Sequence, residues 1–308
     1  MKPKIIVICG PTASGKTALS IELAKKIDGE IVSCDSMQIY KDMNIGSAKP
    51  TKEEMEGIKH YLLDFVSPED RYSVADYKKD AIIAINEIIE KGKIPIIVGG
   101  TGLYVDSLIY NIEYPEIEFD EEYRKSLEKR AKEEGLQNLY EEAKQIDEQA
   151  MKNISQNDKK RILRVLELYH QTGKTKTEQE IESRKNEVPY NYYVFALNMD
   201  REKLYDRINK RVDIMVEQGL IEEVEGIIKK YNTYPTSMQA LGYKEIKEYL
   251  NRNITKEQAI ETVKQETRRY AKRQLTWFRK NKQTIWLNAL NKKEDNIKKI
   301  LEEINWKM

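Results

Sequence analysis

The fold is decided by one stretch, Gly10-Pro11-Thr12-Ala13-Ser14-Gly15-Lys16-Thr17, which matches the phosphate-binding pattern G-x-x-x-x-G-K-[ST]. It follows an apolar run, Ile5–Cys9, that predicts a strand, and it precedes a helical pattern from Ala18 to Ile27. In this context successive backbone N–H groups and the helix N-terminus form an anion site, to which Lys16 adds positive charge. A glycine-rich turn without a ligand would not need the lysine and the threonine at this spacing. We therefore predict binding of a di- or triphosphate, with Thr17 as a ligand of Mg²⁺.

Further short apolar runs recur along the chain and are separated by segments with helical periodicity. Continuous apolar character is typical of parallel strands that are buried on both faces. We predict an α/β fold whose core is a parallel sheet of the P-loop NTPase type. The predicted strands are Ile5–Cys9, Glu30–Cys34, Ile94–Val98, Tyr192–Leu197 and, with a weaker pattern, Thr284–Leu287.

The middle of the chain has a different character, since it is highly charged, follows helical spacing and contains no strand pattern. Val188-Pro189 ends this segment, because a residue before proline disfavours the helical conformation. We predict a helical insertion domain over residues 116–189. Residues 1–115 then form the first part of the core, and residues 190–308 return to the sheet and add C-terminal helices.

The overall charge restricts how the chain could bind nucleic acid. Among 308 residues, 53 Lys and Arg nearly balance 52 Asp and Glu, so such binding would depend on local basic clusters. Cys9 and Cys34 fall in predicted strands and are expected to be buried thiols rather than a disulfide. The chain starts without a basic and apolar leader and has no apolar run of about 20 residues. We expect a cytoplasmic protein that does not enter a membrane.

Two more loops follow predicted strands and should lie near the phosphate loop, because the carboxyl ends of parallel strands meet at one edge of a sheet. Asp35 follows the second strand and could contact magnesium or a nucleoside, act as a general base, or cap the next helix. Gly99-Gly100-Thr101-Gly102 follows the third strand and would allow close backbone approach around the Thr101 hydroxyl. This strand lacks the terminal Asp that a hydrolysing ATPase uses, which disfavours a kinase or an ATPase.

Several segments together resemble the bacterial tRNA dimethylallyltransferases, the tRNA isopentenyltransferase family. The resemblance extends nearly from end to end and is specific as a set, although each segment after the first would be weak alone. Ser47 and Val165 stand where the family more often has Thr and Ala, and neither touches the expected chemistry. The matching segments are residues 10–17, Asp35-Ser36-Met37-Gln38-Ile39-Tyr40, Ile45-Gly46-Ser47-Ala48-Lys49-Pro50, residues 96–104, residues 157–167 and Gln274-Leu275-Thr276-Trp277-Phe278-Arg279.

The resemblance implies that the loop binds the diphosphate of dimethylallyl diphosphate together with Mg²⁺. The acceptor would be the exocyclic N6 of the adenosine 3′-adjacent to the anticodon in a tRNA. Asp35 matches the family's general base, and Thr101 matches the residue that bonds near the bridging oxygen and the tRNA. Lys16 would stabilise the departing pyrophosphate. The expected diphosphate contacts are Gly10, Pro11, Thr12, Ala13, Ser14, Gly15, Lys16, Thr17 and Arg207.

The resemblance also implies contacts to the tRNA anticodon stem-loop, and a basic helical segment, Lys264–Gln283, adds to them. The arginines could instead be ordinary solvated helix charges. Tyr270, Trp277 and Phe278 fit a core face better than a base-stacking platform. His60 and His170 have no second ligand at metal spacing and are expected to be structural. The expected tRNA contacts are Asp35, Ser36, Met37, Gln38, Thr101, Arg124, Lys159, Lys160, Arg161, Arg164, Arg269, Lys272 and Arg273.

Two other interpretations stay open from the sequence. An adenylate isopentenyltransferase would share the phosphate loop, but a mononucleotide acceptor needs neither the insertion nor the basic helix. A non-catalytic RNA-binding protein on a relic loop would not need Lys16, Thr17, Asp35 and Thr101 together. A phosphoryl-transfer enzyme would be recognised by ADP formation from ATP. We expect a monomer.

Overall fold

The computed structural model describes residues 2–115, 120–183 and 185–306, and it divides the chain into two compact units. The first unit, called the core unit here, comprises Met1–Ile109 and Pro189–Met308. The second, called the helical unit, comprises Tyr110–Val188. The predicted first residue of the insertion, Glu116, lies outside the described residues.

Within the described residues the core unit contains one six-stranded sheet with the order β3-β2-β4-β1-β5-β6, and every neighbouring pair is parallel. The predicted α/β class with a parallel sheet is thus confirmed. The strand that was not predicted, β3, has only two residues, too few for an apolar pattern to register. The strands are β1 (Lys4–Cys9), β2 (Gly29–Ser33), β3 (His60–Tyr61), β4 (Ile94–Gly99), β5 (Asn191–Asn198) and β6 (Ile285–Asn288).

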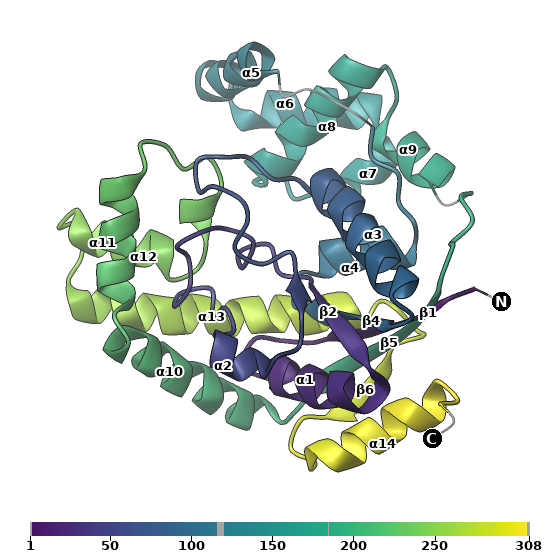
Figure 1. Ribbon diagram of the computed structural model, residues 1–308. Coiled ribbons are helices and arrows are strands. Elements are labelled where there is room, and N and C mark those ends of the chain that lie inside the picture. The colour runs from purple at the N-terminus through teal and green to yellow at the C-terminus, as the bar shows by residue number, and fades with distance from the viewer. Residues whose placement is uncertain (1, 116–119, 184, 307–308) are drawn as a thin grey trace. The chain divides into compact units, whose positions relative to one another are not determined.

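Helices cover both faces of this sheet (Figure 1). Helices α3 and α4 pack on one face, and α1 and α14 pack on the other. The helices of the core unit are α1 (Lys16–Ile27), α2 (Lys52–Met55), α3 (Val74–Glu90), α4 (Gly102–Ile109), α10 (Arg201–Glu217), α11 (Leu220–Lys230), α12 (Tyr243–Leu250), α13 (Lys256–Phe278) and α14 (Lys293–Glu303), with a 3-10 turn at Ser237–Gln239.

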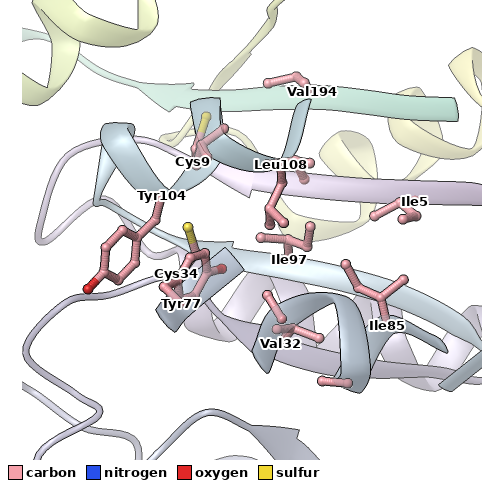
Figure 2. Packing of buried hydrophobic residues seen from close by; sticks show 14 of the residues in the cluster. Ile5, Cys9, Val32, Cys34, Tyr77, Ile85, Ile97, Tyr104, Leu108 and Val194 are labelled. Carbon is pink, nitrogen blue, oxygen red and sulfur yellow. The ribbon is translucent and has the colours of Figure 1, made fainter. Parts of the chain in front are cut away.

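The core on the α3 and α4 face joins sheet residues to helix residues, as Figure 2 shows for Val32 of β2, Ile85 of α3 and Leu108 of α4. Cys9 and Cys34 lie within this cluster as buried free thiols. Burial raises the pKa of the Cys34 thiol to about 12, so it stays protonated and unreactive at neutral pH. Both cysteines are therefore packing residues, as the sequence indicated.

The helical unit has an apolar core of its own, which includes Leu127, Leu139 and Ile162. The three side chains come from three different helices, each of which buries one apolar stripe and exposes charges on the other side. None of the described helices, in either unit, is long and apolar enough to cross a membrane. The helices of this unit are α5 (Glu121–Glu133), α6 (Leu136–Ile146), α7 (Glu148–Met151), α8 (Lys159–Thr172) and α9 (Lys176–Ser183).

Candidate functional site

The candidate site lies at the carboxyl edge of the sheet, where β2, β4 and β1 are direct neighbours in that order. Three loops follow these strands, and they carry Asp35, Thr101 and Lys16 respectively. Backbone hydrogen bonds connect the loops, since Cys34 N donates to Val98 O at 2.7 Å and Thr101 N donates to Cys34 O at 3.2 Å. The topology thus brings together the loops that the sequence predicted to share one edge.

The phosphate loop wraps around the lysine side chain. Helix α1 begins at Lys16, directly after Gly15, whose φ of 90° is left-handed. The Lys16 Nζ donates to the carbonyl oxygens of Gly10 at 3.1 Å and Pro11 at 2.7 Å. An anion placed over the start of α1 would meet the ammonium group as well as the unpaired N–H groups of the helix N-terminus.

Charged groups from two other segments act on Lys16. Burial, together with the positive charge of Arg211, lowers the pKa of Lys16 to about 8, and the negative charge of Asp35 opposes the shift. Burial likewise lowers the pKa of Arg211, against the opposing charge of Asp35. Two partly buried cations and one carboxylate therefore converge on this edge of the sheet, which is an arrangement suited to a multiply charged anion.

Arg211 was missed by sequence reasoning, which assigned the anion contact to Arg207. The two residues are one turn apart on α10, and Arg207 is exposed. Two contacts fix α10 to α13, namely a hydrogen bond from Arg268 to Asn209 at 2.6 Å and an ion pair between Lys264 and Asp213 at 2.6 Å. The i,i+4 spacing from Arg207 could have suggested Arg211, but only the packing of α10 shows which arginine lies nearer to Lys16.

Asp35 is oriented by the backbone that follows it. Its Oδ1 accepts hydrogen bonds from Met37 N at 2.9 Å and from Gln38 N at 3.4 Å. Residues 36–39 form turns and not a helix. The Asp35 side chain therefore stabilises a turn, where the sequence had offered a helix cap as one possibility. Among the described residues no donor reaches Oδ2, and this oxygen is left to accept a proton or a hydrogen bond from a substrate.

Thr101 is held between the Asp35 loop and helix α13. Its Oγ1 accepts a hydrogen bond from Ser36 N at 3.0 Å. The close approach requires glycine at position 99, where a Cβ would lie 1.9 Å from Cys34 O. Burial raises the pKa of the Tyr270 hydroxyl, the charge of Asp35 adds to this, and a hydrogen bond with the Thr101 side chain opposes it. Tyr270, which the sequence suggested as a core residue, thus lies beside the candidate catalytic groups.

The Gln38 side chain makes hydrogen bonds to another segment of the protein. Its Nε2 donates to the carbonyl oxygens of Ser47 at 3.3 Å and Ala48 at 3.1 Å. Glu223 of α11 supports the same segment, because its carboxylate accepts from the backbone N–H groups of Asn44, Ile45 and Gly46 at 2.9, 2.7 and 3.1 Å. Sequence reasoning missed Glu223, since nothing in its local pattern connects α11 to this distant loop.

A cation at this site would need oxygen ligands from its substrate. The described residues contain no group of three or more His, Cys, Asp or Glu side chains that could hold a metal ion. Thr17, in the first turn of α1, is partly buried, and its hydroxyl makes no hydrogen bond with any described residue. A single side-chain oxygen from Thr17 fits Mg²⁺, which usually takes one or two protein oxygens and completes its coordination shell with phosphate oxygens and water.

The predicted basic residues of the helical unit fall into two groups. Arg124 donates to Glu128 at 3.0 Å and to Glu167 at 2.9 Å, so its guanidinium fixes α5 against α8. Lys159, Lys160 and Arg161 instead occupy the first turn of α8, where positive charge opposes the helix dipole. Arg161 and Arg164 are exposed, with acidic neighbours at 3.4 and 3.7 Å.

In the core unit, helix α13 has an exposed basic face and a buried face. Arg269, Lys272 and Arg273 are exposed on the first, and the Arg273 guanidinium lies 5.7 Å from the centre of the Tyr270 ring. Gln274 is buried on the second and was not given a role from the sequence. The aromatic residues follow the predicted core face, since Phe278 is buried and Trp277 donates to Asp106 at 2.9 Å.

Comparisons with known proteins identify the family of this chain. Residues 38–281 match the sequence profile of a family described as IPP transferase. A tRNA dimethylallyltransferase of Acetivibrio thermocellus is 50% identical over 303 residues, which cover 98% of this chain and 96% of the relative.

Two solved structures are also similar to this chain. One is the full-length tRNA isopentenylpyrophosphate transferase of Bacillus halodurans, at 43% identity and a TM-score of 0.74, with 99% of this chain and 96% of that chain covered. The other is a eukaryotic dimethylallyltransferase acting on tRNA, at 30% identity and a TM-score of 0.83, with 98% of this chain and 80% of that chain covered.

Proposed function

Because the chain belongs to the IPP transferase family, we propose that it is a tRNA dimethylallyltransferase. It transfers the dimethylallyl group from dimethylallyl diphosphate to N6 of the adenosine 3′-adjacent to the anticodon, in tRNAs that read codons starting with U, and releases diphosphate. The observation that carries this proposal is the convergence of Lys16, Arg211 and Asp35 at one edge of the sheet.

The cations of this edge stabilise the leaving group. As the allylic C–O bond breaks, negative charge develops on the diphosphate, and the backbone N–H groups at the N-terminus of α1 face it together with Lys16 and Arg211. The Lys16 ammonium exchanges its present carbonyl partners for phosphate oxygens. Arg207 contacts the outer part of the same anion from one turn earlier on α10. Mg²⁺, held through Thr17, would neutralise further charge on the diphosphate when bound.

Asp35 acts as the general base. The N6 lone pair forms a bond to the allylic carbon while the C–O electron pair leaves with the diphosphate, and the N6 proton passes to Asp35. The turn that binds Oδ1 leaves Oδ2 to receive this proton. Thr101 is fixed through Ser36 N, and its hydroxyl would bond near the bridging oxygen and the acceptor base.

The tRNA is bound mainly through exposed basic residues. Arg269, Lys272 and Arg273 of α13 contact the phosphate backbone from the core unit. In the helical unit, phosphates are contacted by four residues of α8, namely Lys159, Lys160, Arg161 and Arg164. The first three lie in the first turn, where positive charge is unfavourable beside the helix dipole, and an anionic partner would compensate this cost. Ser36, Met37 and Gln38 shape the pocket for the extracted base, and Arg124 acts indirectly by fixing α5 to α8. We propose that the reaction takes place in the cytoplasm.

Mass spectrometry of tRNA nucleosides tests this proposal. Cells that lack the protein should lose dimethylallyladenosine from the anticodon loop, and the wild-type gene should restore it, whereas a gene carrying Lys16→Ala should not. Unchanged dimethylallyladenosine in the deletion strain would reject the function. ADP formation from ATP by the purified protein would instead favour phosphoryl transfer.

A further inference from the structure

A buried amide connects the phosphate loop to the Gly99–Gly102 loop. Gln274 of α13 is 5% exposed, and each end of its side-chain amide is used. Its Oε1 accepts from Thr12 N at 2.9 Å, and its Nε2 donates to Gly100 O at 2.9 Å. The amide therefore joins a loop that would bind the diphosphate to a loop that carries Thr101.

The surrounding backbone selects an amide at this place. Thr12 offers a donor and Gly100 offers an acceptor, so the bridging group must accept at one end and donate at the other. A Cβ on Gly100 would lie 2.1 Å from the Gln274 Nε2, which shows how closely the two are packed. An ionised carboxylate of the same length could accept from Thr12, but it would face the Gly100 carbonyl without a proton to donate.

Helix α13 also reaches the acceptor side of the site. Tyr270 lies one turn before Gln274, and the charge of Asp35 adds to the burial that raises the pKa of its hydroxyl, so α13 also approaches the proposed general base. Thr101 in turn accepts from Ser36 N, next to Asp35 in the chain. Gln274 thus joins the phosphate loop to the Gly99–Gly102 loop, and the bond from Ser36 N to Thr101 joins that loop to the segment that carries the proposed general base.

We propose that Gln274 is a positioning residue that fixes the diphosphate loop relative to Thr101 and Asp35. This inference rests on the proposed function. Since it sets the geometry between leaving group and base, it affects the chemical step more than the binding of either substrate. A misplacement of about 1 Å can lower the rate of a chemical step by about 10²-fold.

The test compares single-turnover rate constants for prenyl transfer in the wild-type protein, Gln274→Met and Gln274→Glu. Gln274→Met removes both hydrogen bonds at similar volume and should lower the rate constant by about 10²-fold, with the KM of each substrate changed by less than about threefold. Gln274→Glu should be equally slow at pH 8.5. Its rate relative to wild type should recover as pH falls toward 6, because the protonated acid donates to Gly100 O while accepting from Thr12 N.

Gln265→Glu is the matched control, since it adds the same charge at an exposed position of the same helix. Its rate relative to wild type should not change with pH. A Gln274→Met rate within threefold of wild type, or a flat pH dependence of the Gln274→Glu ratio, would overturn the inference; the second criterion decides alone if Gln274→Met does not fold. Absence of transfer by the wild-type protein would instead reject the proposed function.

Discussion

Different interactions stabilise the two regions of the molecule, namely the sheet edge of the core unit and the helical unit. At the sheet edge, backbone hydrogen bonds and the close approach at Gly99 join the loops after β2 and β4, and the buried Gln274 side chain joins the phosphate loop to them. The helical unit is held by one small apolar core and by exposed ion pairs, such as Lys125 with Glu121 at 3.0 Å. Such surface pairs contribute about 0 to 1 kcal/mol each.

The two regions differ in how precisely their side chains must be placed. Bond formation at N6 depends on the placement of a base and a leaving group, and buried groups with fixed partners supply that placement. Attraction of a polyanion depends on the number and sign of charges, and exposed helical side chains supply it without fixed geometry. We therefore expect large effects on the rate from single changes at the sheet edge, and small graded effects on affinity from changes in the basic surfaces.

The largest effect should come from Asp35→Asn. The amide cannot take the N6 proton, so the single-turnover rate constant should fall by about 10²- to 10⁴-fold while both substrates still bind. Asp206→Asn, an exposed change on α10, is the control and should leave the rate unaltered. A loss confined to tRNA affinity would make Asp35 a recognition residue and would contradict the assignment of the chemical step to the sheet edge.

Lys16→Ala should follow, with a loss of about 10²- to 10³-fold in the transfer rate, because it removes charge from the leaving-group site. The wild-type protein should also bind inorganic pyrophosphate less tightly as pH rises above about 8. The Lys16 pKa is lowered to about 8, and only the protonated amine attracts the anion.

Lys16→Arg is the control for this pH dependence, because a guanidinium keeps its proton throughout. Calorimetry from pH 7 to 9 should show the affinity of the wild type falling relative to Lys16→Arg by up to about tenfold per pH unit above the pKa. If the pyrophosphate affinities of the two proteins changed with pH in the same way, loss of the Lys16 proton would not control binding of the anion.

A smaller effect is expected from the exposed face of α13. Replacing Arg269, Lys272 and Arg273 by glutamine should weaken tRNA binding and reduce the slope of log K against log salt by about 0.7 to 0.9 for each phosphate that the protein no longer neutralises. The transfer rate at saturating tRNA should change little. A control that neutralises three scattered exposed lysines, namely Lys26, Lys229 and Lys298, should leave the slope in place. Equal slopes in both triple variants would make the α13 residues ordinary surface charges.

The smallest effect should come from the helical unit. Arg161→Gln with Arg164→Gln should lower tRNA affinity by a few fold and shift the salt dependence in the same direction, with thermal stability nearly unchanged. Lys125→Gln with Lys129→Gln removes the same charge from exposed positions of α5 and serves as the control. A rate loss as large as that of Asp35→Asn would show that the helical unit takes part in chemistry.

The sequence predicted much of the fold because its signals are local. The five predicted strands agree with the structure to within one or two residues at each end, since buried parallel strands are continuously apolar. The phosphate loop, Asp35 and Thr101 were found because each follows directly after such a strand. The strand β3 was not predicted, because two residues are too few to show a hydrophobic pattern.

The residues that complete the site could not be found in the same way. Arg211, Gln274 and Glu223 lie far along the chain from the loops they serve, on helices whose local patterns indicate only amphipathic packing. Gln274 even stood within a segment that resembles the family, yet its partners, Thr12 N and Gly100 O, are backbone groups that no side-chain pattern reveals. Tertiary packing alone brings them together.

The central claim is that the sheet edge performs the transfer while the basic surfaces present a tRNA to it. The most direct measurement is kcat/KM for dimethylallyl transfer to an anticodon stem-loop with adenosine just 3′ of the anticodon, compared with AMP. A stacked adenine must be extracted into the site at a cost of a few kcal/mol, which contacts from the basic surfaces offset. We predict efficient transfer to the stem-loop and little to AMP, ADP or ATP. A comparable kcat/KM on AMP would contradict the claim and would assign the chain to the mononucleotide-modifying enzymes.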